Sequence, residues 1–209
     1  MPKPSTDNYE HKHLAAIRAA AAVFATKGYH GSSTRDIAER LGIKQGSLYY
    51  YFKSKEDALA EVCLYGMQDY VERMNRIAAS DQPFPAKLTA TITSHITKYR
   101  EKNEALHVYH AERLYLPQAK RRKLYELGSG YREQLEGIFA TAVKNGEVRP
   151  ETDCNFASHA VIGICNGWGE FIARNPNSDL SEIIEKCVEL LLNGFSKQKT
   201  PNERNQNIG

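Results

Sequence analysis

The sequence has no long hydrophobic run. No stretch of its 209 residues approaches the ~20 consecutive apolar residues that a membrane-spanning helix needs. The opening segment, MPKPSTDNYEHKH, also lacks the apolar centre of a secretion signal. We therefore expect a cytoplasmic protein with no membrane partner.

Cysteine is scarce and scattered. The four cysteines form no CxxC pair, which argues against a zinc site and against a disulfide framework. No Ser-His-Asp, Cys-His or paired-carboxylate signature with a supporting context occurs. We therefore expect no catalytic residues, no metal and no cofactor.

Alternating apolar and polar residues, internal repeats and low-complexity tracts are also absent. Apolar residues instead recur at helical spacing almost throughout. The expected fold class is all-α, with about nine helices. They are predicted near residues 13–28, 34–41, 44–52, 55–79, 85–102, 104–115, 118–144, 153–174 and 180–196.

Positive charge is concentrated at the N-terminal end. The net charge is +3, and residues 1–60 contain all of the excess, with nine Lys and Arg against six acids. A basic segment of this kind is typical of contact with a polyanion.

Residues 34–53 have the pattern of two helices joined by a tight turn. Ala38 occupies the position where the helices cross closely, and Gly42 lies at the turn, where a positive φ is expected. Apolar residues around them form the interior of the pair: Ile37, Leu41, Ile43, Leu48 and Tyr51. This arrangement predicts a helix-turn-helix, whose second helix enters the major groove of DNA.

Four consecutive aromatic residues follow in the stretch LYYYF, and they cannot all share one face of a helix. We expect Tyr51 and Phe52 to turn inward. Tyr49 and Tyr50 are predicted to turn outward and donate hydrogen bonds to phosphates.

Residues 44–47, which precede the tyrosines, are predicted to read base edges. The start of the preceding helix, at Thr34, and Lys55 are predicted to contact the DNA backbone. The predicted DNA-binding residues are Thr34, Arg35, Lys44, Gln45, Gly46, Ser47, Tyr49, Tyr50 and Lys55.

The segment STRDIAERLGIKQGSLYYYFKSKEDAL, residues 33–59, resembles the DNA-binding domain of the TetR/AcrR family of ligand-responsive transcriptional regulators. The resemblance implies an Ω-shaped homodimer that represses by binding an inverted-repeat operator, with half-sites about one helical turn apart. A small, mainly apolar effector then spreads the recognition helices and releases the DNA. The implied domains are residues 1–53 for DNA binding, 54–198 for effector binding and dimerisation, and a flexible tail, 199–209.

The last predicted helix is apolar around more than half of its circumference, which suits burial against its own subunit and a partner. A buried core helix would show the same pattern. The predicted dimer-interface residues are Ile183, Ile184, Cys187, Leu191 and Phe195.

Apolar and aromatic residues of the middle helices, with Asn166 as a polar donor, are the candidates for an effector pocket, although such a stripe also forms ordinary core. They are Tyr70, Met74, Ile96, Tyr109, Tyr131, Leu135, Asn166 and Trp168.

The segments CNGW and GEVRPETD are similar to family branches that sense fatty acyl or other acyl-CoA thioesters. The basic run KRRK, residues 120–123, either meets ligand phosphates or is a solvated helix start.

Other readings fit a helix-turn-helix chain. It could act as an effector-independent regulator or an activator, which would need no closed cavity within residues 60–175. A helical enzyme with an accessory DNA-binding module would need titratable residues converging in that cavity, and an architectural DNA protein would have a filled core.

Overall fold

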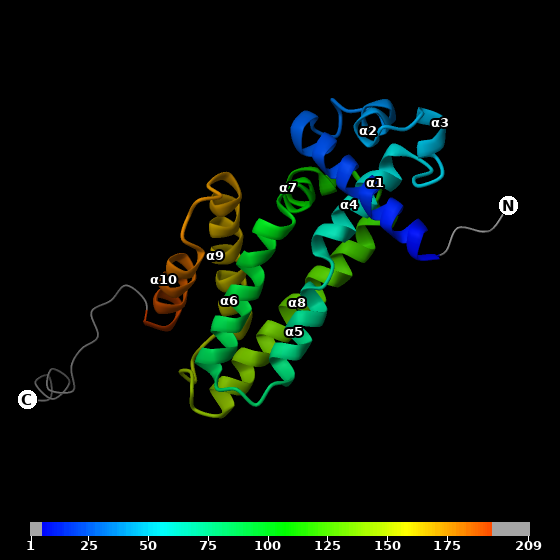
Figure 1. The fold of residues 1–209 in the computed structure, drawn as a ribbon. Coiled ribbons are helices and arrows are strands. Elements are labelled where there is room, and N and C mark those ends of the chain that lie inside the picture. The colour runs from blue at the N-terminus through cyan, green and yellow to red at the C-terminus, as the bar shows by residue number, and fades with distance from the viewer. Residues whose placement is uncertain (1–5, 194–209) are drawn as a thin grey trace, which may run out of the picture.

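A computed structural model describes residues 6–193 of the chain and shows ten α-helices, one short 3₁₀ helix and no strand within that range (Figure 1). The all-α prediction is confirmed. The helices are α1 (Thr6–Lys27), α2 (Thr34–Leu41), α3 (Gln45–Leu48), α4 (Lys55–Met67), α5 (Tyr70–Ala79), α6 (Phe84–Glu101), α7 (Asn103–Glu112), η1 (Arg113–Tyr115), α8 (Gln118–Lys144), α9 (Cys154–Arg174) and α10 (Leu180–Asn193). Phe195 and the predicted tail lie outside the described residues.

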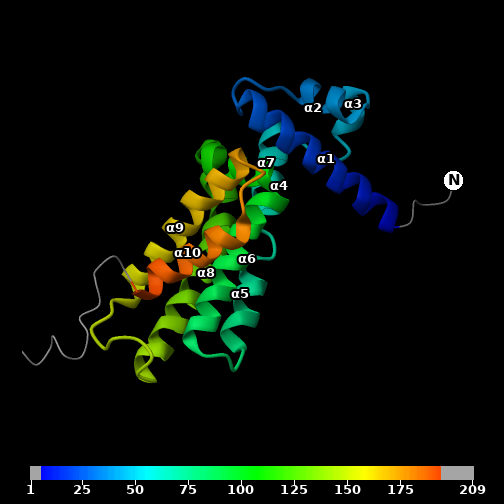
Figure 2. The same cartoon turned by 60° about the vertical axis from the view of Figure 1, so that its left-hand side comes forward.

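Buried apolar side chains form two clusters. The first joins α1, α2 and α3 to α4 and α7, around fully buried residues such as Phe24, Ile37 and Leu59. The second lies among α5, α6, α8, α9 and α10, around Ile96 and Leu135. Figure 1 shows α1–α3 at one end of the molecule and α9 and α10 along the far side of the helical bundle. In the turned view of Figure 2, α10 lies across the outside of the bundle beside α9.

The fourth predicted helix, expected to be continuous over residues 55–79, is broken into α4 and α5. Asp69 between them has φ 71°, a left-handed conformation that Asp tolerates better than most residues. Lys98 of α6 and Lys102, the residue after this helix, secure the break: Lys98 Nζ lies 3.4 Å from Asp69 Oδ2, and Lys102 Nζ donates to the carbonyl of Tyr65 over 2.8 Å. The break therefore depends on cations from a region distant in sequence, and it explains why ten helices replace about nine.

Helices α6 and α9 approach each other very closely at Gly169. A Cβ atom placed there would lie 2.3 Å from Cδ2 of the Tyr99 ring. Only glycine fits, because van der Waals contact needs a much longer separation.

Among the described helices, none combines the length and the apolar character required to cross a bilayer.

Candidate nucleic-acid interface and ligand-binding region

Helix α2 begins with a capping box. The Ser33 hydroxyl accepts a hydrogen bond from the amide of Asp36 over 3.2 Å, and the Asp36 carboxylate accepts one from the amide of Ser33 over 2.7 Å. Asp36 also forms an ion pair with Lys27 at the end of α1. The hydrogen bond from Lys27, with those from Ser33, holds the pKa of the Asp36 carboxyl far below its usual range. This pair ties the first helix of the predicted motif to α1.

The turn after α2 has the expected geometry. Gly42 has φ 72°, and a Cβ atom there would meet nothing within 4 Å, so the backbone conformation and not crowding requires glycine. The amide of Ile43 donates to the carbonyl of Ala38 over 3.0 Å. Ala38 is 1% exposed, as expected for the residue at the helix crossing.

The aromatic run divides as predicted. Leu48 and Phe52 are each 2% exposed and join the N-terminal core, whereas Tyr49 and Tyr50 are 53% and 65% exposed. Tyr51 is half-buried. One short segment is therefore anchored from beneath by apolar side chains and presents two tyrosines to solvent.

Tyr51 packs in an aromatic stack with α1. Its ring centroid lies 6.2 Å from that of His13 and 6.3 Å from that of Tyr9. This stack fixes the end of the recognition segment against the first helix.

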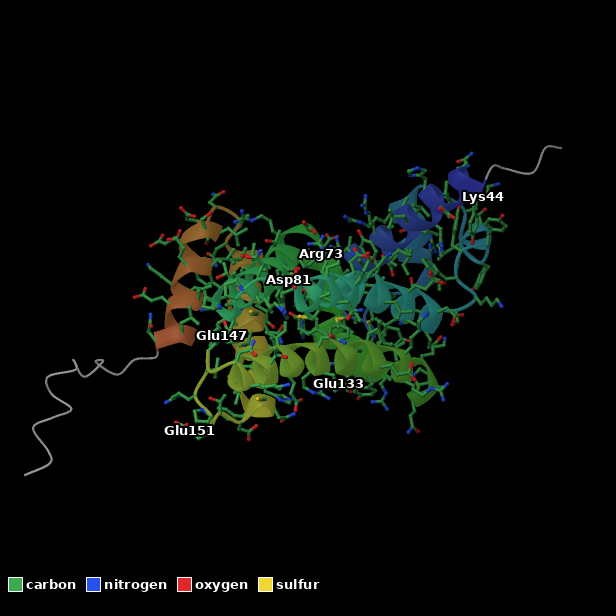
Figure 3. All side chains as sticks on the ribbon, turned by 90° about the horizontal axis from the view of Figure 1, so that it is seen from below. Lys44, Arg73, Asp81, Glu133, Glu147 and Glu151 are labelled. Carbon is green, nitrogen blue, oxygen red and sulfur yellow. The ribbon has the colours of Figure 1, made fainter. Side chains whose placement is uncertain are left out.

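The predicted base-reading residues lie exposed on the same segment: Lys44, Gln45, Gly46 and Ser47. Lys44 lies at the end of the molecule formed by the N-terminal helices (Figure 3). The Gln45 side-chain amide donates to the Thr34 hydroxyl over 3.1 Å, and Arg35 donates to Glu39 over 2.8 Å on the surface of α2. The hydrogen bond between Gln45 and Thr34 brings the first and second helices of the motif together without covering their outer face.

Lys55 differs from the prediction. Its ammonium group donates to the backbone carbonyls of Tyr29 and Ser32 over 2.7 and 2.8 Å, and it lies 4.3 Å from the centroid of the Tyr29 ring. These contacts turn the charge inward, toward two carbonyls of the loop after α1. Lys55 therefore secures that loop, and we do not place its charge on the DNA backbone.

The C-terminal bundle contains a buried polar cluster around His95 of α6. Asn166 Oδ1 on α9 lies 2.8 Å from the Tyr99 hydroxyl and 3.0 Å from His95 Nε2. An amide oxygen only accepts, so Nε2 is protonated and His95 Nδ1 accepts from the Tyr131 hydroxyl at 3.0 Å. The Tyr99 hydroxyl in turn accepts from His110 Nε2 over 2.8 Å. The cluster links α6, α7, α8 and α9 through two branches of hydrogen bonds that converge on Asn166 Oδ1.

Burial keeps this cluster neutral. It lowers the pKa of His95 from 6.5 to about 4, against the smaller opposing effect of the hydrogen bond to Asn166. Burial likewise raises the pKa of the Tyr131 hydroxyl well above its usual value. A neutral network of this kind specifies one packing of the helices.

Five of the predicted pocket residues come together in the C-terminal core: Tyr70, Met74, Ile96, Tyr131 and Leu135, all less than a tenth exposed. Asn166 joins them through His95. Tyr109 packs against the N-terminal cluster instead, and Trp168 is 40% exposed. The prediction omitted His95 and Tyr99, although His95 lies on the apolar face of its helix with Leu88, Ile92 and Ile96.

An apolar face lies open along α9. Its side chains recur every three or four residues, and the bulkiest, Phe156, Trp168 and Phe171, are 73%, 40% and 45% exposed. Between them lies a hollow of about 340 Å³ lined by Gly163, Ile164, Gly167, Trp168 and Phe171. An exposed apolar stripe of this kind on a helix marks an interaction surface.

The predicted dimer residues of α10 contact the core of their own subunit, yet all but Cys187 stay partly exposed, so their place in an interface stays a prediction. Cys187 is 2% exposed, and Ile183, Ile184 and Leu191 pack against the C-terminal core. Leu192, which is 40% exposed, is left on the outer side of this helix.

No group of three His, Cys, Asp or Glu side chains within the part of the chain that the structure describes is arranged to hold a metal ion.

Two family models match the chain. Residues 16–62 match "Bacterial regulatory proteins, tetR family", and residues 81–195 match "Tetracyclin repressor-like, C-terminal domain". Together they span the helix-turn-helix and most of the C-terminal bundle.

Three similar proteins are informative. The "Fatty acid metabolism regulator protein" of Bacillus subtilis is 28% identical over 88% of this chain and 95% of its own length. The "HTH-type transcriptional repressor KstR2" of Rhodococcus jostii is 30% identical over 75% of this chain and 77% of its own length. The crystal structure of FadR from B. subtilis in complex with stearoyl-CoA superposes with a TM-score of 0.73 and 28% identity, covering 88% of this chain and 99% of that one. These relatives are transcriptional regulators.

Proposed function

Because this chain belongs to the TetR family of bacterial regulatory proteins and is a DNA-binding transcriptional regulator, we propose that it is a repressor. It binds an inverted-repeat operator as a homodimer and leaves the DNA when an acyl-CoA thioester binds its C-terminal bundle. It has no catalytic role, and it works in the cytoplasm, where the DNA is.

The anchored recognition segment is the observation that carries this proposal. Leu48 and Phe52 are buried beneath it, so the short helix cannot rotate, and its outer side presents Lys44, Gln45 and Ser47 for base edges. The exposed tyrosines lie beside them, and their hydroxyl groups can donate to the phosphate backbone. We assign the DNA contacts to Thr34, Arg35, Lys44, Gln45, Gly46, Ser47, Tyr49 and Tyr50.

The similarity to B. subtilis FadR supports the choice of effector, because that protein was crystallised with stearoyl-CoA. The C-terminal core of the present chain is rich in apolar and aromatic side chains between α5, α6 and α8, which suits an acyl chain. We place the acyl chain beside Tyr70, Met74 and Ile96.

The open face of α9 is the centre of the proposed dimer. Gly163 and Gly167 are one helical turn apart on this face, and a Cβ atom at either position would meet nothing within its own subunit. Glycine weakens a helix interior by about 1 kcal/mol relative to alanine, so nothing within the subunit accounts for the pair. The close approach of a second α9 across a two-fold axis does account for it.

Release from DNA tests the proposed function. Purified full-length protein should bind DNA from the region upstream of its own gene, and long-chain acyl-CoA should displace it at lower concentration than the corresponding free fatty acid. Fluorescence anisotropy of labelled DNA measures both steps. DNA binding that no acyl-CoA reverses would instead support an effector-independent regulator.

Two variants separate backbone contact from base reading. Tyr49→Ala should weaken binding to the operator and to unrelated DNA by a similar factor, about five- to tenfold, because it removes a phosphate hydrogen bond. Gln45→Ala should relax base preference at one half-site position, at a cost of about 1–3 kcal/mol for the preferred base. Binding to a set of operators with single base changes measures both effects. Unchanged affinity in Tyr49→Ala, or an unchanged preference in Gln45→Ala, contradicts the corresponding assignment.

A further inference from the structure

A groove of about 600 Å³ runs between α5 and α6, on the outer side of the helices that contain the proposed acyl site. Its walls combine two arginines, three hydroxyl groups and two small apolar surfaces: Arg73, Arg76, Ile77, Ala90, Thr93, Ser94 and Thr97. Arg73 lies in the middle part of the molecule, well separated from Lys44 at the DNA-binding end (Figure 3). We propose that this groove binds the phosphate groups of the effector's coenzyme A moiety, an inference that rests on the proposed acyl-CoA function.

The two guanidinium groups retain their hydrogen-bonding capacity. Arg73 lies 3.9 Å from a carboxylate oxygen of Glu101, and Arg76 lies 3.9 Å from one of Glu72. Both N–O separations are too long for a hydrogen bond. The carboxylates hold the cations in place, while their N–H groups remain free to bind phosphate oxygens in the bidentate manner typical of arginine.

The hydroxyl groups of the groove differ from others on the same helix. Thr89 and Thr91 donate their hydroxyl hydrogens to the carbonyls of Pro85 and Lys87, each over 2.8 Å. Within residues 6–193, no such bond is formed by the hydroxyls that line the groove, those of Thr93, Ser94 and Thr97. These three hydroxyl groups can therefore donate to phosphate oxygens without giving up a bond within the protein.

The position of the groove suits a thioester whose tail enters the core. The adjoining buried faces of the same two helices carry Tyr70 and Met74 on α5 and His95 and Ile96 on α6. A nucleotide in the groove therefore directs an acyl chain between α5 and α6 toward these residues.

Two other candidate sites for the phosphates are less favourable. A groove of about 890 Å³ between α1, α4, α5 and α8 is lined by four carboxylates, from Glu10, Glu61, Asp69 and Glu72, which repel phosphate. Within the basic run 120–123, Lys120 is paired with Asp57 over 2.6 Å and Lys123 lines that acidic groove. The structure thus favours the interpretation that the basic run is a solvated helix start and not a phosphate site.

A ligand bound in this groove can change the position of the DNA-binding end of the molecule. Lys98 of α6 and Lys102, directly after it, hold the junction of α4 and α5 through ion pairs with Asp69. A ligand that changes the separation of α5 and α6 therefore changes the position of α4, which packs against α1 of the DNA-binding domain.

Calorimetry with coenzyme A itself tests the groove. The double variant Arg73→Gln/Arg76→Gln of the full-length protein should bind coenzyme A at least about tenfold more weakly than the unmodified protein, because charge-assisted hydrogen bonds to phosphate are lost. Its affinity for the free fatty acid should be unchanged. Arg122→Gln is the matched control, since Arg122 forms a similar exposed pair with Glu126, at 3.6 Å on α8. Thr93→Val/Thr97→Val should give a smaller loss in the same direction.

Thermal unfolding and ligand-free binding to promoter DNA establish that the variants are folded. Equal coenzyme A affinity in the arginine variant and the unmodified protein, an equal loss in Arg122→Gln, or no binding of coenzyme A to the unmodified protein would overturn the subsite.

The same experiments distinguish a failure of the proposed function from a failure of the proposed phosphate subsite. If stearoyl-CoA does not release the unmodified protein from DNA, yet coenzyme A binding depends on Arg73 and Arg76, the groove is a phosphate site and the acyl-CoA switch is wrong. If stearoyl-CoA releases the arginine variant at the same concentration as the unmodified protein, the switch stands and the subsite is wrong.

Discussion

Replacing Gly163 and Gly167 together by leucine should separate the homodimer into subunits that are at least as stable as before. Neither new side chain meets an atom of its own subunit at Cβ, and each removes a helix-weakening glycine, so the subunit should gain about 1–2 kcal/mol. Across the proposed two-fold axis, the leucines hold the two α9 helices too far apart for Trp168 and Phe171 to pack.

Operator affinity should fall by about 100-fold or more in this variant, because a single subunit loses the advantage of binding two linked half-sites. Sedimentation velocity measures the oligomeric state, and anisotropy with promoter DNA measures the affinity. Gly137→Leu is the matched control: this glycine is also exposed in a long helix with nothing within 4 Å of its Cβ position, but it lies on α8. A leucine variant that remains a dimer would show that α9 is not the centre of the interface.

Gly169→Ala should destabilise the C-terminal bundle, although alanine is the better helix former. Its Cβ would lie 2.3–2.5 Å from three atoms of the Tyr99 ring, and Tyr99 is only 2% exposed, so the ring has no free space to enter. Overpacking of this kind costs about 1–3 kcal/mol and occasionally more. Displacing the ring also breaks its hydrogen bonds to Asn166 and His110.

Chemical denaturation of the single and double variants measures this coupling. In a Tyr99→Ala background the obstructing ring is gone, so adding Gly169→Ala should be neutral or slightly stabilising, by up to about 1 kcal/mol. Gly128→Ala, on α8 with nothing within 4 Å of its Cβ position, should be stabilising in both backgrounds. Additive effects of Gly169→Ala and Tyr99→Ala would contradict the close crossing of α6 and α9.

The residue sequence determined the DNA-binding end of this protein almost completely. The signals are local: a small residue at Ala38 and a glycine with positive φ at Gly42 each act within a few residues. The outward turn of Tyr49 and Tyr50 follows from the same short-range pattern, because Leu48 and Phe52 occupy the inner side. The all-α fold and the family followed from these features and from helical periodicity.

Tertiary packing decided the rest. An apolar helix pattern predicts that a face is buried, but it does not identify the partner. The residues predicted for the dimer interface on α10 contact their own core, and an open apolar face lies on α9. The part of α10 in the dimer stays a prediction. The break at Asp69 needed Lys98 from α6, and the inward turn of Lys55 needed carbonyls 23 and 26 residues away. The cluster around His95 joins side chains up to 71 residues apart. Such contacts depend on which helices pack together. The periodicity of apolar residues shows which side of a helix is buried, but it does not show which helix covers that side.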